Sequence, residues 1–488
     1  MRQWNSKRAC GTSRYLLRSK RQKDEPEDAA ECEEIMIEVA VMGYGTVGSG
    51  VVEVIEKNKA EINQKAGEEI NIKYILDLRD FPGDPYADKV VHDVEVILND
   101  PEIQIICETM GGLKPAYEFT KRALLSGKSV CTSNKELVAT HGPELIHIAH
   151  ENKCNYLFEA SVGGGIPIIR PLNYSLTAEK IDGISGILNG TTNYILTKME
   201  KEGAGFEEIL KQAQDLGYAE RNPEADVEGY DACRKIAILS SLMCGKNVRY
   251  QDIYTEGITK ITTEDFVYAK AMGRTIKLLG KSREEDGKLY AMVAPFMISM
   301  DNPLSMVNDV FNAVCVHGNM LGDSMYYGRG AGKLPTASAV VSDVVDCARH
   351  IGKVIMCFWD QQDIALTDIK QSSRRFFVRT VQDKESLALQ EFESVSVITA
   401  DVAGEFAFVT EKMTEKEFDL LYAAHKGKEL AQFSKDTLFM CEKNGWLKSG
   451  KLTESGYEAL SPYKVDNAII MANWKKLKRV MQVPYRIM

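Results

Sequence analysis

The amino-acid sequence predicts an α/β fold in three parts: a parallel sheet flanked by helices, a larger α+β domain and a small C-terminal α+β domain. The first part is indicated by a short apolar strand from Ile37 that runs into a glycine-rich turn and then a helix. Strand-like and helix-like segments alternate from there to about Glu159. This alternation is typical of βαβ units, which build parallel sheets.

The elements of the first domain, residues 36–159, follow from their residue patterns. Further strands are expected at INIKYILDL (70–78), IQIICET (103–109), KSVCTS (128–133) and NYLFEAS (155–161). Helices are expected between them, over residues 115–126 and 142–152. A later amphipathic helix, residues 336–352, is expected to complete this domain.

Residues 160–335 predict an α+β domain with mostly antiparallel strands. Helix-like patterns extend over FEEILKQAQDLGYA (206–219), YDACRKIAILSSLMCG (230–245) and TEDFVYAKAMGRTIKLLG (263–280). Strand-like patterns occur in LYAMVAPFMIS (289–299) and FNAVCVHG (311–318).

The two ends of the chain differ from these domains. Residues 372–488 begin with three strand-like runs and a helix, at 374–381, 395–401, 404–413 and 414–425. Residues 1–35 comprise 23 residues without an acid and then an acidic segment. Arg-rich, acid-poor segments are typical of targeting peptides, and charge blocks are also typical of disordered tails. We therefore expect a tail that is either disordered or targeting-like.

Composition excludes several functional classes. The 488 residues carry a net charge of −10, so the chain has no general reason to bind nucleic acid or an anionic membrane. No apolar run reaches the roughly 20 residues that span a bilayer. The eleven cysteines include no CxxC pair, and their odd number argues against a disulfide framework. These features predict a cytoplasmic protein with reduced thiols and without nucleic-acid or membrane partners.

Gly43, Gly45 and Gly48 form GxGxxG immediately after a strand and at the start of a helix. The first glycine permits a tight turn, the second lets a pyrophosphate approach the backbone, and the third lets the helix pack on the strand. The N–H groups at the helix start then face the phosphates. This context predicts a dinucleotide site rather than an ordinary glycine turn.

Two residues after the second strand bear on the choice of cofactor. Asp77 lies where an acid binds the ribose 2′-OH of NAD, whereas Arg79 suits the 2′-phosphate of NADP. Because they indicate opposite cofactors, NAD and NADP both stay open, with a slight preference for NADP.

A charged stretch, residues 217–235, precedes an apolar helix. Asp231 and Lys235 are four residues apart, share a helix face and are followed at once by IAIL. One interpretation is an ordinary surface ion pair. The other is a buried catalytic lysine, because a helix that is apolar nearly all round is buried, and a buried ammonium needs carboxylates. Beside a dinucleotide site the second is favoured, since hydride transfer to a carbonyl needs a proton donor.

Three further turns are candidate sites, although each is also compatible with a plain turn. EASVGGGIP (159–167) offers carbonyls that suit a hard cation. GILNGTTNYIL (186–196) starts a helix whose N–H groups can hold a carboxylate, and GRGAGKLPTASAV (328–340) can press its backbone against a ring.

Together these motifs resemble homoserine dehydrogenase. VAVMGYGTVGSGV, TSNKELVA, FEASVGGGIPII, GILNGTTNYIL, DVEGYDACRKIAIL and GRGAGKLPTASAVVSD keep the family's order and spacing over residues 37–352. The resemblance implies a Rossmann-type cofactor domain followed by a substrate and dimerisation domain, in a homodimer or homotetramer. It implies reversible NAD(P)-dependent reduction of L-aspartate 4-semialdehyde to L-homoserine, in threonine, methionine and isoleucine biosynthesis.

The resemblance also implies roles for individual residues. Lys235 would be the general acid/base, with Lys135 near substrate and nicotinamide. Glu220 and Asp231 would hold the substrate's amino end, among the substrate-binding residues Glu220, Asp226, Asp231, Gly190 and Thr191. The cofactor positions, including those argued above, are Gly43, Gly45, Thr46, Val47, Gly48, Asp77, Arg79, Thr109, Lys135 and Gly332. A monovalent cation, expected to be sodium, would bind the backbone oxygens of Glu159, Val162, Gly164 and Ile166.

Two features depart from a simple family pattern. Arg221-Asn222-Pro223 replaces the common Ala-Asp-Pro, so a carboxylate is lost and a cation is added near the substrate. The C-terminal unit resembles the ACT regulatory domain only faintly, which implies an amino-acid effector although no glycine-rich ligand turn is evident.

Two rival functions are another NAD(P)-dependent semialdehyde or amino-acid reductase and a non-catalytic amino-acid sensor of the same fold. The intact pairing of NGTTNYIL with DVEGYDACRK disfavours the first. The presence of Lys235 and Lys135 disfavours the second.

Overall fold

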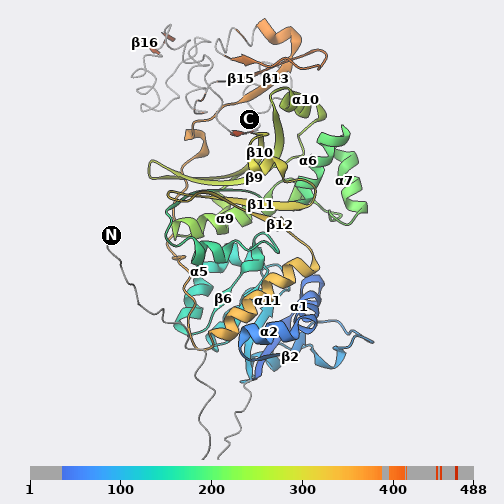
Figure 1. The fold of residues 1–488 in the computed structure, drawn as a ribbon, viewed down its shortest axis with the longest axis vertical. Helices are drawn as coiled ribbons and strands as arrows, with labels where there is room; N and C mark the ends of the chain where they lie inside the picture. The colour runs from blue at the N-terminus through green and yellow to red at the C-terminus, as the bar shows by residue number, and fades with distance from the viewer. Residues whose placement is uncertain are drawn as a thin grey trace, which may run out of the picture. The chain divides into compact units, whose positions relative to one another are not determined.

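The first sheet is the parallel sheet that the sequence predicts (Figure 1). The computed structural model describes residues 36–386, 389, 395–410, 412, 414, 447–448, 451–452 and 468–470. The sheet contains β1 (Met36–Met42), β2 (Glu69–Leu76), β3 (Val90–Val91), β4 (Ile103–Glu108), β5 (Ser129–Thr132) and β6 (Tyr156–Leu157). Its spatial order is β3-β2-β1-β4-β5-β6, with all neighbours parallel. The order reverses between β1 and β4, where doubly wound sheets bind ligands at the carboxyl ends of their strands.

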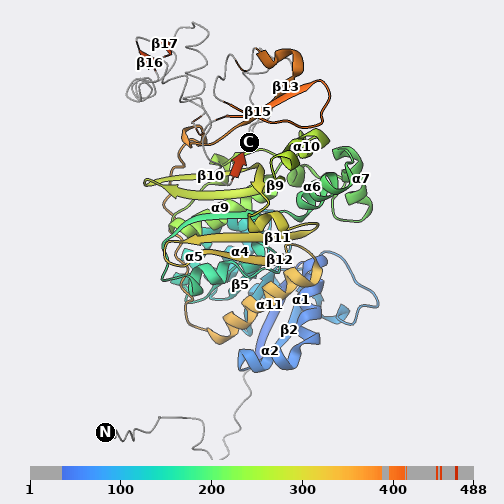
Figure 2. The same cartoon turned by 45° about the horizontal axis from the view of Figure 1, so that its top comes forward.

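Helices cover both faces of this sheet. On one face lie α1 (Thr46–Lys57), α2 (Lys59–Ala66) and α11 (Lys333–Arg349), seen together in Figure 2. The other face packs against α4 (Ala116–Leu125) and α5 (Lys135–Glu151), while α3 (Glu95–Leu98) is a single turn. Alternate residues of β1 belong to the two cores: Val39 and Val41 to the first, Ala40 and Met42 to the second. Because both faces are buried, the central part of β1, Val39–Met42, is continuously apolar.

One helix boundary differs from the prediction in a way that matters for the site. The helix expected over residues 142–152 begins at Lys135, where Asn134 caps it by accepting a hydrogen bond from Leu137 N at 3.1 Å. Pro143 lies inside the helix and has no N–H to donate to the carbonyl of Ala139. A proline in a helix normally marks a boundary, which is why the pattern predicted too late a start.

The second domain is built on a mixed, seven-stranded sheet. Its main path is β12-β11-β7-β9-β10-β18, and β8 pairs beside it with β10. The strands are β7 (Ile181–Ile187), β8 (Tyr254–Thr255), β9 (Arg274–Glu285), β10 (Lys288–Ser299), β11 (Phe311–Gly318), β12 (Gly322–Arg329) and β18 (Ala468–Ile470). The helices are α6 (Gly190–Glu202), α7 (Phe206–Asp215), α8 (Glu224–Val227), α9 (Tyr230–Cys244) and α10 (Thr263–Ala271). The buried helix α9 packs on β7, β9 and β10.

The prediction of one helix over residues 263–280 is wrong. The helix α10 ends at Ala271, and the chain is strand β9 from Arg274 onward. Residues 274–280 are all buried, so this strand lacks the alternation of exposed and buried residues that identifies a half-buried strand. A short apolar run of this kind cannot be told from a buried helix by periodicity alone.

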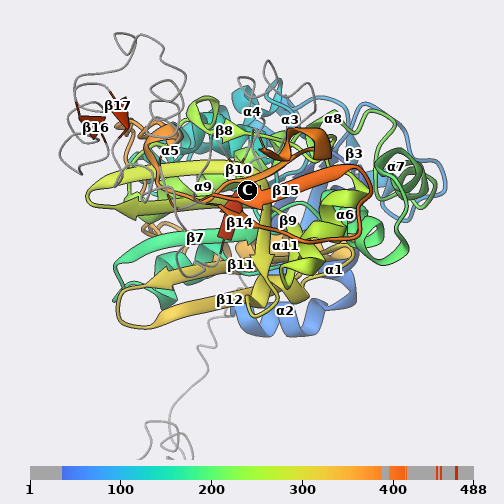
Figure 3. The same ribbon diagram turned by 90° about the horizontal axis from the view of Figure 1, so that it is seen from above.

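The C-terminal unit contains a small antiparallel sheet, seen in Figure 3 with β14 beside β15. Its strands are β13 (Phe377–Val381), β14 (Ser396–Val397) and β15 (Glu405–Val409), in the order β13-β15-β14. A separate two-stranded pair joins β16 (Leu447–Lys448) to β17 (Lys451–Leu452). Apart from Thr414, the expected helix over 414–425 lies outside the described residues, as do most of the C-terminal tail and the N-terminal segment 1–35.

Short helical turns connect these elements at Ala87–Lys89, Glu159–Ser161, Pro171–Ser175, Tyr250–Asp252, Pro303–Met306, Ile369–Gln371 and Gln382–Lys384. Within the described ranges, no helix has the length and apolar character needed to cross a membrane.

A buried lysine ties the second domain together. Lys277 on β9 has no exposed surface, and its Nζ donates to the oxygens of Val307 (backbone, 2.7 Å), Asn308 (Oδ1, 3.0 Å) and Asn193 (Oδ1, 3.3 Å). These contacts fix α6 and the loop before β11 to the sheet. Burial lowers the pKa of Lys277 to about 8, against a smaller opposing attraction to Glu200.

This environment predicts a pH-dependent contribution to stability. Between pH 8 and about 10.5 the unfolded chain binds more protons at Lys277 than the folded chain, so the stability that this residue contributes rises with pH. The melting temperature of the wild type, minus that of Lys277→Met, should therefore increase from pH 7.5 to pH 9.5. Lys288→Met, at an exposed position on β10, is the control and should show a constant difference. If the difference in melting temperature between the wild type and Lys277→Met also stays constant with pH, the expected titration of Lys277 is wrong.

Candidate active site

Lys235 lies in the second turn of α9 and is almost fully buried, with 8% of its surface exposed. Its Nζ donates to Asp231 Oδ2 and to the backbone carbonyl of Leu188, each at 2.7 Å. Since Leu188 directly precedes the turn into α6, these bonds connect α9 with the end of β7. The buried ion pair that the sequence suggested is present, and it is not a surface pair.

Asp231 is the centre of a larger charged cluster. Its Oδ1 lies 2.9 Å from Nζ of Lys135, so the carboxylate bridges two ammonium groups. Burial by itself would raise the pKa of Asp231, but attraction to Lys235 and Lys135 outweighs it and holds the pKa well below its usual range. The carboxylate is therefore ionised at neutral pH, and its one negative charge attracts both lysine Nζ groups.

Lys135 reaches this cluster because α5 begins at that residue, directly after β5. Its side chain is 43% exposed, and attraction to Asp231 raises its pKa despite an opposing effect of burial. A second charge pair, Glu136 with Arg234 at 3.4 Å, joins the same two helices. The cluster thus lies at the carboxyl edge of the parallel sheet, the edge that binds ligands in such folds.

Asn189 was not singled out from the sequence, although it lies within GILNGTTNYIL. Its Nδ2 donates to Asp226 Oδ1 at 2.7 Å and to Asp231 Oδ2 at 2.9 Å, while its Oδ1 accepts from Thr192 N at the start of α6. Burial, then repulsion from Asp231, raises the pKa of Asp226. The available signal was an asparagine before a helix, since Asn is a preferred N-cap residue.

The other expected substrate residues surround the start of α6. Gly190 is its first residue, and Thr191 Oγ1 donates to the carbonyl of Tyr218 at 2.6 Å. This bond holds the turn that leads to Glu220 against the helix. Glu220 itself is exposed, and in the described part of the chain its carboxylate makes no hydrogen bond or ion pair. The structure therefore brings Asp226, Asp231 and Lys235 together but leaves Glu220 at the edge of the group.

The glycine-rich turn has the geometry that a dinucleotide needs. Gly43 has a φ of +94°, and a Cβ at Gly48 would lie 1.8 Å from the carbonyl oxygen of Gly43. A Cβ at Gly45 would meet no atom within 4 Å, which leaves its backbone accessible to a pyrophosphate. Thr109 Oγ1 donates to the Gly43 carbonyl at 2.8 Å and braces the turn. Thr46 and Val47 form the first turn of α1.

Asp77 and Arg79, which indicated opposite cofactors, bind each other. Arg79 donates from Nε to Asp77 Oδ1 at 2.9 Å and from Nη2 to Oδ2 at 3.0 Å. This guanidinium lowers the pKa of Asp77 well below its usual range. Asp77 also accepts from Tyr44 N at 2.9 Å, so it supports the glycine turn as well.

Two glycine-rich loops, one around Gly164 and one around Gly330, are in close backbone contact. A Cβ at Gly164 would lie 2.5 Å from the carbonyl oxygen of Gly330, and Gly165 N donates to the carbonyl of Arg329 at 3.1 Å. Gly332 directly precedes α11. The loop that carries the expected cation ligands is thereby fixed to the start of α11.

The expected cation loop can offer backbone oxygens rather than carboxylates. The side chain of Glu159 is 97% buried and accepts hydrogen bonds from the N–H groups of Ile168, Ile169 and Arg170, at 2.6, 2.9 and 2.8 Å. No group of three or more His, Cys, Asp or Glu side chains suited to a metal ion occurs among the described residues. The Glu159 carboxylate is thus engaged by backbone N–H groups, which leaves the carbonyl oxygens of Glu159, Val162, Gly164 and Ile166 as the candidate ligands of this loop.

Chemically, this arrangement suits proton transfer beside a bound dinucleotide. A buried ammonium is hydrogen-bonded to a carboxylate, and neutral donors and carbonyls surround it. The glycine turn, Thr109 and Lys135 all lie at the carboxyl ends of parallel strands.

Comparisons with known proteins agree with this geometry. A family model described as homoserine dehydrogenase matches residues 167–345, and one described as its NAD-binding domain matches residues 43–159. Homoserine dehydrogenase of Bacillus subtilis is 37% identical over 84% of this chain and 99% of its own length.

Solved structures show the same similarity. A homoserine dehydrogenase from Thiobacillus denitrificans has a TM-score of 0.74 at 34% identity and covers 81% of this chain and 95% of its own. A hyperthermophilic archaeal homoserine dehydrogenase mutant in complex with NADPH has a TM-score of 0.55 at 30% identity, over 64% of this chain and 97% of its own.

Proposed function

The chain belongs to the homoserine dehydrogenase family, and we propose that it interconverts L-aspartate 4-semialdehyde and L-homoserine with Lys235 as the general acid/base. It is an NAD(P)-dependent oxidoreductase that acts on a small molecule. The observation that carries the proposed role of Lys235 is the Lys135–Asp231–Lys235 cluster at the carboxyl edge of the cofactor sheet, in which Asp231 and Lys235 are buried.

Lys235 would exchange one proton with the oxygen of the substrate. The nicotinamide of the bound cofactor supplies the hydride for the aldehyde carbon in the reductive direction. As negative charge grows on the oxygen, Lys235 Nζ donates a proton to it, and Asp231 and the Leu188 carbonyl hold Nζ in place. Lys135, on the other oxygen of Asp231, would lie near both reactants and add positive charge.

The polar ends of the substrate would be bound around the start of α6. We propose that Glu220, with Asp231 and Asp226 behind it, receives the ammonium group. Gly190 and Thr191, in the first turn of the helix, would receive the carboxylate. The hydrogen bond from Thr191 to Tyr218 supports this arrangement, because it keeps the Glu220 turn beside the helix.

We propose that the cofactor domain comprises residues 36–159 with α11, and that residues 160–335 form the substrate and dimerisation domain. The family match that ends at residue 159 supports the boundary between them, and the packing of α11 against α1 supports placing this helix in the cofactor domain. The edge strand β12 exposes Met325 (45%) and Tyr327 (52%), which favours pairing with a second copy in a homodimer or homotetramer. If the protein sediments as a monomer at micromolar concentration, the proposed homodimer or homotetramer is excluded.

A monovalent cation, most simply sodium, is proposed at the backbone oxygens of Glu159, Val162, Gly164 and Ile166. The cation would stiffen the contact between this loop and the Gly330 loop. Replacing sodium by choline at constant ionic strength should lower activity, and unchanged activity would exclude the site.

The C-terminal unit, residues 372–488, is proposed as an ACT-like regulatory domain that binds an amino acid. The antiparallel sheet of β13, β14 and β15 supports a module of its own within this unit, while β18 from the same unit pairs with β10 of the second domain. Activity of the full chain should respond to an amino acid such as threonine, and a lack of response to every proteinogenic amino acid would oppose a regulatory role.

We also propose a cytoplasmic location, which cell fractionation tests, and a place in threonine, methionine and isoleucine biosynthesis.

Lys235→Met tests the proposed proton donor. Methionine keeps the apolar stem but removes the ammonium, so kcat should fall by roughly 10²–10⁴-fold while cofactor binding is retained, since the glycine turn is a separate element. Lys246→Met, just beyond the end of α9, is the matched control and should keep wild-type activity. A folded Lys235→Met enzyme with a near wild-type kcat would show that the proton comes from elsewhere.

Arg79→Ala tests the preference for NADP. We propose that the Arg79 guanidinium, 63% exposed, binds a 2′-phosphate while Asp77 keeps it oriented. The variant should raise KM for NADPH about tenfold or more and leave KM for NADH nearly unchanged, because only NADPH carries the phosphate. Equal KM changes for both cofactors would instead indicate damage to the glycine turn, and no change would exclude the contact.

A further inference from the structure

Glu108, the last residue of β4, carries a buried carboxylate beside the proposed active site. None of its surface is exposed, so it does not contact a reactant directly. Thr109 follows it, and the Thr109 hydroxyl braces the Gly43 turn. Its partner in register on the next strand is Thr132, three residues before Lys135. The Glu108 carboxylate therefore lies between the glycine turn and the start of α5, the two elements that the proposed reaction needs at this edge of the sheet.

One carboxylate oxygen holds the loop after β4 against the glycine turn. Glu108 Oε1 accepts a hydrogen bond from Met110 N at 2.8 Å. A Cβ at Gly43 would lie 3.1 Å from the N and Cα of Met110, so the loop and the turn are in close backbone contact. The bond to Glu108 therefore fixes the position of the backbone that covers the turn.

The other carboxylate oxygen holds the start of α5. Glu108 Oε2 accepts from Thr132 Oγ1 at 2.7 Å, and Thr132 Oγ1 accepts from Asn134 N at 2.9 Å. Asn134 caps α5, and its Nδ2 donates to the carbonyl of Gly112 at 2.6 Å. The cap of α5 is thus bonded to Glu108 through one hydroxyl and to the loop after β4 directly. Lys135 is the next residue, so these bonds set the place from which its side chain begins.

The position of Glu108 is better explained by geometry than by stability. Burial raises the pKa of Glu108, while its hydrogen bonds with Thr132 and Met110 N act in the opposite direction. Buried charges are a weak source of stability, because the cost of desolvation offsets the contacts that they make. Both oxygens of a carboxylate accept hydrogen bonds, so one side chain can bind donors of two segments at once. Here the two segments are the loop after β4 and the strand that leads into Lys135.

We propose that Glu108 is a positioning residue for the proposed reaction. It sets the place of Lys135 at the carboxyl edge of the cofactor sheet by tying the start of α5 to the loop on the Gly43 turn. Because Glu108 acts only through Lys135, this role rests on the function proposed for that lysine. A misplacement of about 1 Å can cost about 10²-fold in rate. Loss of the bond to Thr132 should therefore lower kcat and leave NADPH binding, which depends on the glycine turn, nearly unchanged.

Glu108→Gln tests this role. The amide oxygen can still accept from Met110 N, whereas the NH₂ group faces the Thr132 hydroxyl, which is itself a donor to the carboxylate. We expect kcat to fall about tenfold or more, with the Kd of NADPH within about threefold of the wild type. Thr132→Val removes the hydroxyl at nearly the same volume and should reproduce this pattern.

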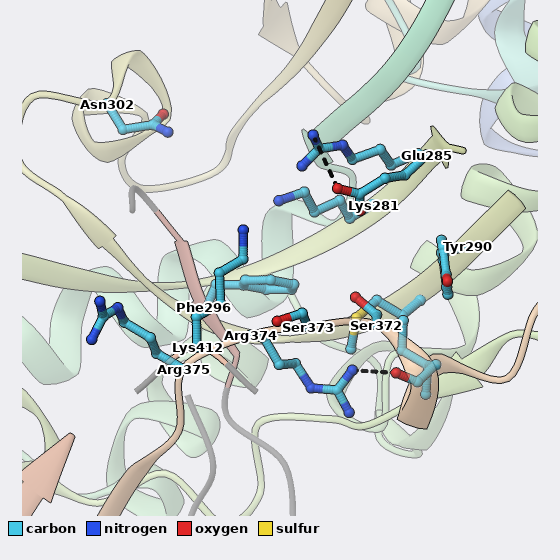
Figure 4. Close-up of a pocket in the computed structure, with 13 residues that line it drawn as sticks. Lys281, Glu285, Tyr290, Phe296, Asn302, Ser372, Ser373, Arg374, Arg375 and Lys412 are labelled. Atoms are coloured by element: carbon cyan, nitrogen blue, oxygen red, sulfur yellow. Dashed lines mark hydrogen bonds and ion pairs between the residues drawn. The ribbon is translucent and has the colours of Figure 1, made fainter. Parts of the chain in front are cut away.

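Glu285→Gln is the matched control. It is the same substitution at an exposed residue that lines the cavity of about 280 Å³ beside β9 and β10 (Figure 4). Neither kcat nor the Kd of NADPH should change in this variant. If Glu108→Gln and Thr132→Val also keep the wild-type kcat, or if both lose NADPH binding as strongly as kcat, the positioning role is wrong.

A double-mutant cycle with Lys135→Met shows whether Glu108 acts through the lysine. If it does, Glu108→Gln should lower kcat by less than about threefold once residue 135 carries no ammonium group to misplace. An equal loss of kcat in both backgrounds would overturn the proposal but leave Lys135 in its role. A wild-type kcat for Lys135→Met alone would instead show that the role proposed for Lys135 is wrong, and the role of Glu108 would fall with it.

Acetylation of amines by acetic anhydride gives a readout that does not depend on turnover. Lys135 is partly exposed, and its contact with Asp231 hinders its reaction. In Glu108→Gln the displaced Lys135 should react about threefold faster or more, while Lys128, a buried lysine of the same domain, should stay protected. Faster labelling of both lysines, which indicates general loosening of the domain, or unchanged labelling of Lys135 would overturn the proposal.

Discussion

A carboxylate with only 5% of its side chain exposed holds the site together at the start of α9. Asp231 contacts Lys235, Lys135 and Asn189, which belong to or border three helices and the ends of two strands. Taking such charges out of water costs several kcal/mol per ion, and the cost is offset only when partners are close and well placed. The cluster therefore works as a constraint: α5, α6 and α9 must be assembled together before the charges are compensated.

Backbone contact imposes a second constraint, on glycines rather than charges. Gly48 lies against the Gly43 carbonyl, and Gly164 lies against the Gly330 carbonyl, each with no room for a Cβ. The first contact fixes the start of α1 on β1, and the second fixes the proposed cation loop to the start of α11. At both places the glycines present backbone and no side chain, so no side chain blocks the cofactor or cation that would bind there.

Sequence patterns predicted the parts of the molecule in which local and tertiary preferences agree. The strand–turn–helix at Gly43 was predictable because its φ angles and packing require particular residues at fixed spacing. The pairing of Asp231 with Lys235 was predictable from a four-residue spacing on one helix. The strand β9 was not, because a strand buried on both faces shows no period of two.

The partner that a side chain chooses was also beyond sequence patterns, both for residues two apart and for residues in distant segments. Nothing in a single chain indicates that Asp77 and Arg79 pair instead of competing for a ribose, or that Asn189 links Asp226 to Asp231. Lys135 and Lys277 show why such partners matter. Attraction to the Asp231 carboxylate raises the pKa of Lys135, whereas burial among neutral oxygens lowers the pKa of Lys277 to about 8. The same residue type thus holds a permanent charge in one place and a titratable one in another, and the difference lies in the chemistry of the partners that the fold supplies.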